Sequence, residues 1–331
     1  MDRDEARTVK RQLAGYVGEL LAGRVRASGA APASAGIGLG LAPLPDGGYG
    51  VALRYRLGVP TARMVARKVA EQVGPTVDVR RTGRIRATPG RTAPAPRPPV
   101  VTALALGETG RARPLRPGVS IAHADVSAGT LGAFVEVDGA LHALSNYHVL
   151  VGAPSARVGD TVLQPGPADG GRDPDDRVGV LAAFDALTRG RTATVDAAVA
   201  RLDDPEVDLR YPVGLITTTA VADGGESVAK IGRTTGLTEG RVSAIELDDV
   251  VVGYGEELGE LRFDDQIEVE STSAAPFSRG GDSGSLVYRA DGVALGLLFA
   301  GSETGGDNGS GLTYLNPIGA ALDALGARLA G

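Results

Sequence analysis

The sequence contains no cysteine and no tryptophan, and it has only three histidines in 331 residues: His123, His142 and His148. The absence of cysteine excludes disulfide bonds, thiol nucleophiles and cysteine metal sites. Three histidines leave little material for a histidine-rich metal centre, so we expect neither a metal nor a cofactor. A chain without cysteine also fits a reducing cytoplasm.

Long apolar segments are also missing. No stretch approaches the ~18–20 apolar residues that a membrane span needs. The first residues, Met1 to Arg7, show neither the basic start nor the apolar run of a secretory signal. We therefore expect a cytoplasmic protein that does not contact membranes.

Charge is spread unevenly along the chain. Residues 1–117 hold 20 Lys and Arg against 8 Asp and Glu, whereas residues 118–331 hold 14 against 32. The basic part has three interpretations: it binds an anionic surface or nucleic acid, it docks on the acidic remainder, or it is only a solvated arginine-rich face. No nucleic-acid motif accompanies it, so we do not expect nucleic acid as a partner.

Residues 1–88 predict a small α/β domain. Apolar residues recur at helical spacing over 7–27, and alternating patterns predict strands at 36–43 and 51–57. Pro60 suits the first turn of a second helix, which Gly74-Pro75 ends. A further strand is expected over 76–86. The predicted order is therefore α-β-β-α-β.

A proline-rich stretch predicts a linker over 89–117. Residues 118–331 then show many short apolar segments separated by glycine, which is typical of a β-barrel or β-sandwich. The 49 glycines of the chain fit this mainly β interpretation. A last strand and a C-terminal helix are expected over 312–329.

The strongest chemical signal is Gly281-Asp282-Ser283-Gly284. A serine hydroxyl is a weak nucleophile and needs a positioned base. Flanking glycines allow a tight turn, in which the N–H groups of Gly281 and Ser283 can form an oxyanion hole. The alternative is a plain polar turn in a glycine-rich protein.

Two further segments supply candidate partners. His148 follows an apolar segment, and histidine is the natural general base near neutral pH. Asp196 lies within the apolar segment 194–202, where a carboxylate must be paired. A histidine N–H would satisfy it and fix the useful tautomer. Either residue alone has a structural alternative, and His123 and His142 are expected to be structural or exposed.

Together these elements resemble the trypsin/chymotrypsin-like serine protease family. The order His148, Asp196, Ser283 is the order of that family, and the separations of 48 and 87 residues are similar. The segment Lys230 to Val242 also resembles the start of the second barrel in bacterial members. The resemblance covers residues 118–331 and implies two six-stranded antiparallel β-barrels, with the active site between them.

The resemblance also implies roles for residues around the triad. In digestive members a freed N-terminal amine pairs with the aspartate before the nucleophile, here Asp282. Some bacterial members use an internal basic residue, and by position Lys230 is the candidate, with Arg233 and Arg279 behind it. We therefore expect that activity needs no N-terminal processing.

The substrate pocket is carried over more loosely. Its base aligns with Phe277 and its wall with Phe299, Ala300 and Gly301. No aspartate stands at the base, so small or medium apolar side chains are the expected preference. Alternatively, Phe277 belongs to the hydrophobic core.

The sequence thus predicts a serine endopeptidase that acts on protein or peptide substrates. Two alternatives remain: a binding module with a closed protease fold, and an esterase that uses the same triad. Residues 1–88 have three possible roles, namely to bind a partner protein, to guide substrates, or to cover the active site.

Overall fold

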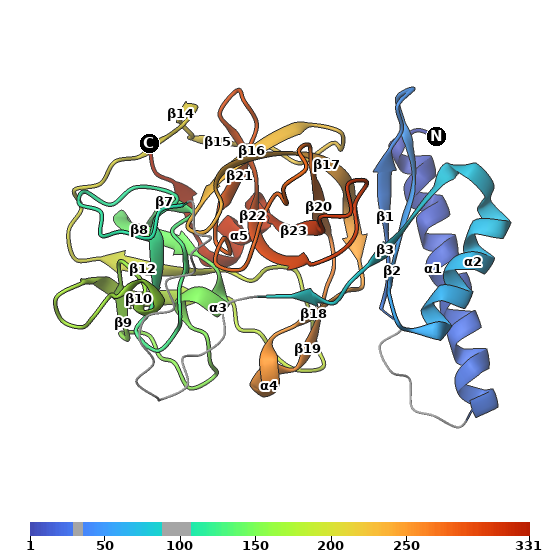
Figure 1. Ribbon diagram of the computed structural model, residues 1–331, viewed down its shortest axis with the longest axis horizontal. Coiled ribbons are helices and arrows are strands. Elements are labelled where there is room, and N and C mark those ends of the chain that lie inside the picture. The colour runs from blue at the N-terminus through green and yellow to red at the C-terminus, as the bar shows by residue number, and fades with distance from the viewer. Residues whose placement is uncertain (29–35, 88–106) are drawn as a thin grey trace.

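The computed structural model describes residues 1–28, 36–87 and 107–331. It consists mainly of β-strands, with an N-terminal α/β unit beside two mainly antiparallel sheet systems (Figure 1). This confirms the predicted fold class. Residues 89–106 of the predicted linker lie outside the described residues, and the proposed domain boundaries stay a prediction.

The N-terminal unit follows the order helix, strand, strand, helix, strand. Its elements are α1 (Arg3–Ser28), β1 (Ile37–Pro43), β2 (Tyr49–Arg56), α2 (Pro60–Val73) and β3 (Val77–Thr82). β1 and β2 form an antiparallel hairpin, and β3 runs parallel to β2. The two helices cover the face of this small sheet that points away from the rest of the chain (Figure 1).

The strand predicted over 51–57 is found as β2, and both of its faces are buried over residues 51–54. Val51 and Leu53 contact the helices in one apolar cluster. Ala52 and Arg54 point to the other side, where the rest of the protein covers them. The sequence pattern could not reveal this second contact, because an arginine in an alternating strand usually faces water.

Six strands close into a ring and form the second barrel. In ring order they are β16 (Ser227–Gly232), β17 (Gly236–Asp248), β20 (Gln266–Ser271), β23 (Leu312–Pro317), β22 (Val293–Ser302) and β21 (Leu286–Tyr288). Each strand pairs antiparallel with the next, and β21 pairs back to β16. Alternate residues such as Val269 and Leu298 fill the interior.

The other sheet is a curled path of strands that precede the second barrel in sequence, joined by the last strand of the chain. Its order is β24 (Arg328–Leu329), β7 (Ala133–Val137), β8 (Ala140–Ser145), β12 (Ala198–Leu202), β10 (Arg177–Phe184), β9 (Thr161–Leu163), β5 (Ser120–His123) and β6 (Gly129–Thr130). This curled half-barrel and the closed second barrel together match the expected double-barrel fold. The C-terminal helix α5 (Ile318–Leu325) packs between β7 and β22.

Several short elements border the two sheets. They are α3 (Tyr147–Leu150), β11 (Thr192–Ala193), β13 (Arg210–Tyr211), β14 (Gly214–Leu215), β15 (Thr218–Thr219), β18 (Val250–Gly253), α4 (Gly255–Leu258) and β19 (Glu260–Phe263). β18 and β19 form a hairpin, and β19 pairs parallel with β11. The hairpin therefore links the second barrel to the segment that leads into β12.

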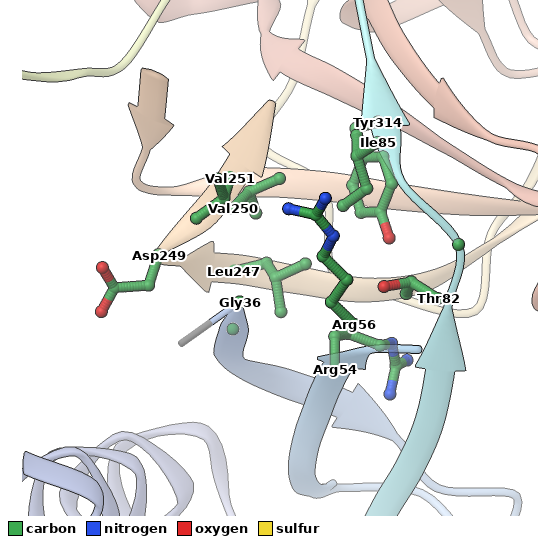
Figure 2. A pocket seen from close by; sticks show the side chains of 12 residues that line it. Gly36, Arg54, Arg56, Thr82, Ile85, Leu247, Asp249, Val250, Val251 and Tyr314 are labelled. Carbon is green, nitrogen blue, oxygen red and sulfur yellow. The ribbon is translucent and has the colours of Figure 1, made fainter. Parts of the chain in front are cut away.

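The N-terminal unit is joined to the second barrel through the backbone. β1 pairs antiparallel with β17, which makes the small sheet an extension of the barrel wall. The strand predicted over 76–86 is divided, and its last part is a separate strand, β4 (Ile85–Arg86). β4 lies between β18 and β22 and pairs with both. A cavity of about 20 Å³ remains at this seam, room for about one water molecule (Figure 2).

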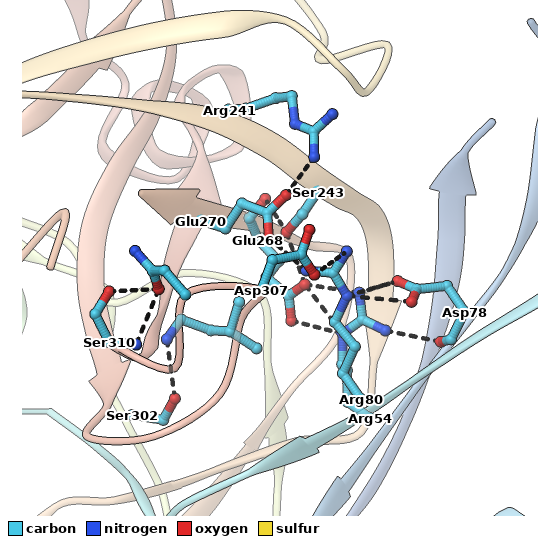
Figure 3. Close-up of polar contacts among 12 residues, drawn as sticks. Arg54, Asp78, Arg80, Arg241, Ser243, Glu268, Glu270, Ser302, Asp307 and Ser310 are labelled. Carbon is cyan, nitrogen blue, oxygen red and sulfur yellow. Dashed lines mark hydrogen bonds and ion pairs between the residues drawn. The ribbon is translucent and has the colours of Figure 1, made fainter. Parts of the chain in front are cut away.

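Ion pairs complete the contact (Figure 3). Arg54 is 3% exposed and contacts Glu268, which is fully buried, through bonds of 2.7–3.0 Å. Arg80 pairs with Glu270 at 2.6 Å, and Asp78 pairs with both arginines at 2.9 Å. Arg3 and Arg7 of α1 form ion pairs with Glu246 of β17 at 3.0 and 2.8 Å. Of the three interpretations of the basic N-terminal part, these contacts support docking on the acidic remainder.

Candidate active site

The imidazole of His148 and the carboxylate of Asp196 form a buried pair. His148 follows the end of β8, and Asp196 precedes the start of β12. These two strands pair antiparallel with Ser145 opposite Ala198, so the segments that carry His148 and Asp196 lie side by side. His148 Nδ1 lies 2.5 Å from Asp196 Oδ2, and the backbone N–H of His148 donates to Asp196 Oδ1 at 3.2 Å. His148 is 5% exposed and Asp196 is fully buried.

Asp196 itself precedes β12 rather than lying inside it, and side chains from both sheet systems fix its backbone. Its carbonyl accepts a bond of 2.7 Å from Asn146 Nδ2, and its N–H donates to Asn316 Oδ1 at 2.9 Å. Asn316 belongs to β23 of the second barrel. The aspartate is therefore held where the two sheets meet.

Sequence reasoning missed Tyr254, whose hydroxyl donates to Asp196 Oδ2 at 2.6 Å. Burial, followed by the charge of Asp196, raises the pKa of Tyr254 well above its ordinary value, so the hydroxyl stays protonated and acts as a donor. The only signal in the sequence is one tyrosine between Gly253 and Gly255, at the end of an apolar segment. That pattern does not indicate a partner 58 residues away.

The loop that carries Ser283 is clamped between the two sheets. Thr130, at the end of β6, donates its N–H to Ser283 O at 2.8 Å and its hydroxyl to Gly281 O at 2.9 Å. Gly281 and Gly284 both have φ of +96°, and a Cβ at either would lie 2.2–2.4 Å from a neighbouring hydroxyl oxygen. The loop therefore requires glycine at both positions.

Gly129 lies between the segment that carries His148 and the loop that carries Ser283. A Cβ at Gly129 would lie 2.4 Å from Val149, the residue after His148, and 3.1 Å from Ser283 O. His148 Nε2 is buried and has no hydrogen-bond partner among the described residues. His148 Nε2 therefore accepts no hydrogen bond from Ser283 Oγ in this structure. Such bonds are often long in enzymes without substrate and tighten in the reacting complex.

Asp282 accepts a dense set of bonds beneath the loop. The N–H groups of Thr234 and Thr235 donate to its Oδ1 at 2.9 and 3.1 Å, and the N–H of Arg279 donates to Oδ2 at 2.9 Å. Lys230 Nζ lies 3.6 Å from Oδ2, and both side chains are fully buried. Burial lowers the pKa of Lys230, and Asp282 opposes that shift. Of the three basic candidates, the structure brings Lys230 to Asp282.

Arg233 instead pairs with Asp169, and its backbone N–H donates to Thr130 Oγ1 at 3.0 Å. The two other histidines also lie elsewhere. His123 Nε2 contacts Asp160 at 3.2 Å, and His142 Nδ1 contacts the carbonyl of Ala140 at 2.9 Å.

Of the four residues assigned to a substrate pocket, Phe277, Phe299 and Ala300 are buried in the second barrel and Gly301 is half-buried. Phe277 is 2% exposed and lies in the barrel core, which is the alternative that the sequence left open. Phe299 is fully buried and its ring lies 4.8 Å from that of Phe263. Gly301, at the end of the wall, pairs with Arg86 of β4. The predicted apolar specificity stays a prediction.

Within residues 1–28, 36–87 and 107–331, no cluster of three or more His, Asp or Glu side chains is arranged to hold a metal ion. The same residues include no helix with the length and apolar character to cross a membrane.

Comparison of the sequence with protein-family models and with curated proteins finds no significant match. Solved structures do resemble the chain. A glutamic-acid-specific serine protease has a TM-score of 0.46 and 24% identity over 65% of this chain and all of that one. Thermobifida fusca protease A has a TM-score of 0.45 and 20% identity over 65% of this chain and 97% of that one. An alpha-lytic protease homologue has a TM-score of 0.44 and 24% identity over 65% of this chain and 99% of that one.

This chain resembles bacterial trypsin-like serine proteases. Glutamate specificity is a property of the first protein and is not transferred to this chain.

Proposed function

We propose that the chain is a serine endopeptidase in which Ser283, His148 and Asp196 form the catalytic triad. One observation carries the proposal: the buried His148–Asp196 pair, with a 2.5 Å contact at Nδ1 and with Nε2 left for the nucleophile. A buried carboxylate that orients an imidazole is the arrangement that a serine nucleophile requires. The clamped Gly-Asp-Ser-Gly loop approaches the same place through Gly129.

In the proposed mechanism, Ser283 Oγ attacks the peptide carbonyl while His148 Nε2 takes its proton. Asp196 holds the imidazole in the required tautomer and stabilises its cationic form. His148 then gives the proton to the leaving amine, which departs and leaves an acyl-enzyme. Water attacks the acyl group with His148 again as the base, and Ser283 is released.

The developing oxyanion is assigned to the backbone N–H groups of Gly281 and Ser283. One such donor is worth about 3–4 kcal/mol of the barrier. The positive φ of Gly281 and the bonds that hold Asp282 support this assignment, because they fix the turn before substrate arrives. We propose that the Lys230–Asp282 pair does here what a freed N-terminal amine does in other members of the family, so that no cleavage is needed to form the loop.

A fluorophosphonate probe tests the proposal. Labelling of the native chain that disappears in Ser283→Ala supports a nucleophilic serine. The matched control is Ser285→Ala, two residues along the same loop, whose hydroxyl donates to the carbonyl of Asp282 at 2.6 Å. Mass spectrometry should locate the label on residue 283. No labelling of the native chain would favour a binding module.

An endopeptidase and an esterase differ in substrate. Turnover of a peptide library against simple esters separates them, and loss of Ser283 or His148 should reduce peptide turnover on the order of 10⁴–10⁶-fold. A map of cleavage sites made with the native chain and with Ser283→Ala also tests the predicted apolar preference. The cytoplasmic location stays a prediction.

Among the three roles left open for residues 1–88, one observation favours covering the active site. β4 pairs with Gly301 and Ser302, the end of the segment assigned to the pocket wall. A strand in this position occupies backbone groups that an extended peptide would otherwise use. The catalytic loop is already formed, so opening would require only that β4 moves away, not that the chain is cut.

Proline at position 86 tests this role, because it disrupts a paired strand. Arg86→Pro should speed fluorophosphonate labelling and peptide turnover if β4 covers the site. Arg86→Ala is the matched control, since it removes the same side chain and keeps the backbone. Slower turnover in Arg86→Pro alone would instead favour a role in guiding substrate.

A further inference from the structure

Tyr254 belongs to the second barrel system, yet it contacts the centre of the candidate triad. Its hydroxyl donates to Asp196 Oδ2 at 2.6 Å, the same oxygen that lies 2.5 Å from His148 Nδ1. Asp196 Oδ1 accepts the backbone N–H of His148 at 3.2 Å. A carboxylate offers about four acceptor positions. Tyr254 thus provides the one side-chain donor to this carboxylate, other than the imidazole, among the described residues.

The ring of Tyr254 is fixed from several sides. It stacks on Phe263 at 5.8 Å and meets the His148 ring edge-to-face, also at 5.8 Å. Its backbone N–H donates to Gly259 O at 2.7 Å and closes the turn between β18 and β19. β19 pairs with β11, which ends three residues before Asp196. The β18–β19 hairpin that carries Tyr254 therefore pairs with the strand that precedes Asp196, and this pairing directs the hydroxyl toward the carboxylate.

We propose that Tyr254 is a positioning residue for catalysis, which acts on substrate only through Asp196 and His148. The proposal rests on the proposed function. Asp196 is fully buried, and a buried carboxylate stays ionised only where donors surround it. The bond from the tyrosine stabilises the charge and fixes the direction of Oδ2. That direction keeps the proton of the imidazole on Nδ1 and leaves Nε2 to accept the proton of Ser283.

Tyr254→Phe is the decisive variant, because it removes the hydroxyl and keeps the ring contacts with Phe263 and His148. We expect kcat to fall about 10-fold with KM within about two-fold, since the lost bond is to a charged group that matters most in the transition state. The low-field proton resonance of His148 Nδ1–H should also move. A merely structural tyrosine would change neither quantity.

Tyr49→Phe is the matched control. Its hydroxyl donates to the backbone carbonyl of Asp223 at 2.8 Å, so the variant loses a tyrosine hydroxyl and its hydrogen bond without touching Asp196. It should keep both kcat and the resonance. Thermal unfolding of both variants checks that each is folded at the assay temperature.

The outcomes separate this inference from the proposed function. A native chain that is active, with Tyr254→Phe unchanged in kcat and resonance, overturns the inference and leaves the proposed function standing. A native chain that neither turns over peptides nor reacts with fluorophosphonate overturns both. In that case the resonance, which needs no activity, still reports whether the hydroxyl bond reaches the imidazole.

Discussion

Replacing Arg54 should loosen the N-terminal unit from the second barrel. Arg54 is 3% exposed, and its guanidinium contacts both oxygens of Glu268 at 2.7–3.0 Å. Arg54→Met removes the charge and keeps an unbranched side chain of similar length. Glu268, which is fully buried, keeps the bond of 2.8 Å from the hydroxyl of Ser243 but loses the cation that pairs with it. An uncompensated carboxylate would then remain inside the interface.

The burial of the Arg54–Glu268 pair determines how much stability the variant should lose. Removing one partner of a buried ion pair costs about 3–5 kcal/mol, because the other charge stays desolvated. The matched control lies two residues along the same strand. Arg56 pairs with Glu260 at 2.6 Å, but these side chains are 23% and 49% exposed. An exposed pair of this kind contributes about 0–1 kcal/mol, so Arg56→Met should have little effect.

Hydrogen exchange is the suitable assay, since β1 and β17 share backbone bonds that break when the unit leaves. A loss of 3 kcal/mol corresponds to exchange about 100-fold faster in Arg54→Met. The double variant Arg54→Met with Glu268→Gln should recover most of the protection, because the amide carries no charge and still accepts the bond from Ser243. Equal exchange in Arg54→Met and Arg56→Met would refute the reasoning.

Three further predictions concern the site and its support. Asp196→Asn should lower kcat on the order of 10⁴-fold by favouring the wrong tautomer of the imidazole, and peptide turnover less than ten-fold reduced would contradict the triad. Lys230→Met should destabilise the chain by about 3–5 kcal/mol in urea unfolding, because Asp282 stays buried without its cation; an unchanged midpoint would count against the pair. Burial would raise the pKa values of Glu246 and Glu270, but hydrogen bonds from arginine side chains outweigh it and hold both below their ordinary value. Docking should therefore lose stability as the pH falls below about 4.5, which exchange of β1 amides at pH 3 and pH 7 would show, and equal protection at both would contradict this.

The sequence contained enough to predict the elements of the fold and the order of the candidate triad. Helical spacing, strand alternation and glycine-rich turns are local signals, and α2 begins at Pro60 as they indicated. His148 and Asp196 could be paired in advance because each needs what the other offers. The pairing of β8 with β12 then brings them to 2.5 Å.

Contacts between distant segments were beyond such reasoning. The burial of Arg54 depends on Glu268, 214 residues later, and nothing in the alternation of β2 identifies that partner. Tyr254 contacts Asp196 only because β18 and β19 form a hairpin beside β11. The small strand β4 was predicted as the end of a longer strand, since its two partners lie far along the chain. Pairing between strands that are distant in sequence depends on the whole folded chain, so the local sequence pattern does not indicate it.

Two contacts that the sequence did not predict, the pairing of β4 and the bond from Tyr254 to Asp196, meet at the β18–β19 hairpin. β4 pairs with Gly253 of β18, and the N–H of Ala87 donates to Gly253 O at 3.2 Å. Tyr254 is the next residue, and its hydroxyl reaches Asp196. The strand proposed to cover the substrate side of the site therefore also borders the residue proposed to position the triad. Displacing β4 would expose the end of β22 and at the same time remove a restraint on Tyr254. The two proposals together therefore predict that access to the site and the geometry of the His148–Asp196 pair are coupled through the backbone of Gly253.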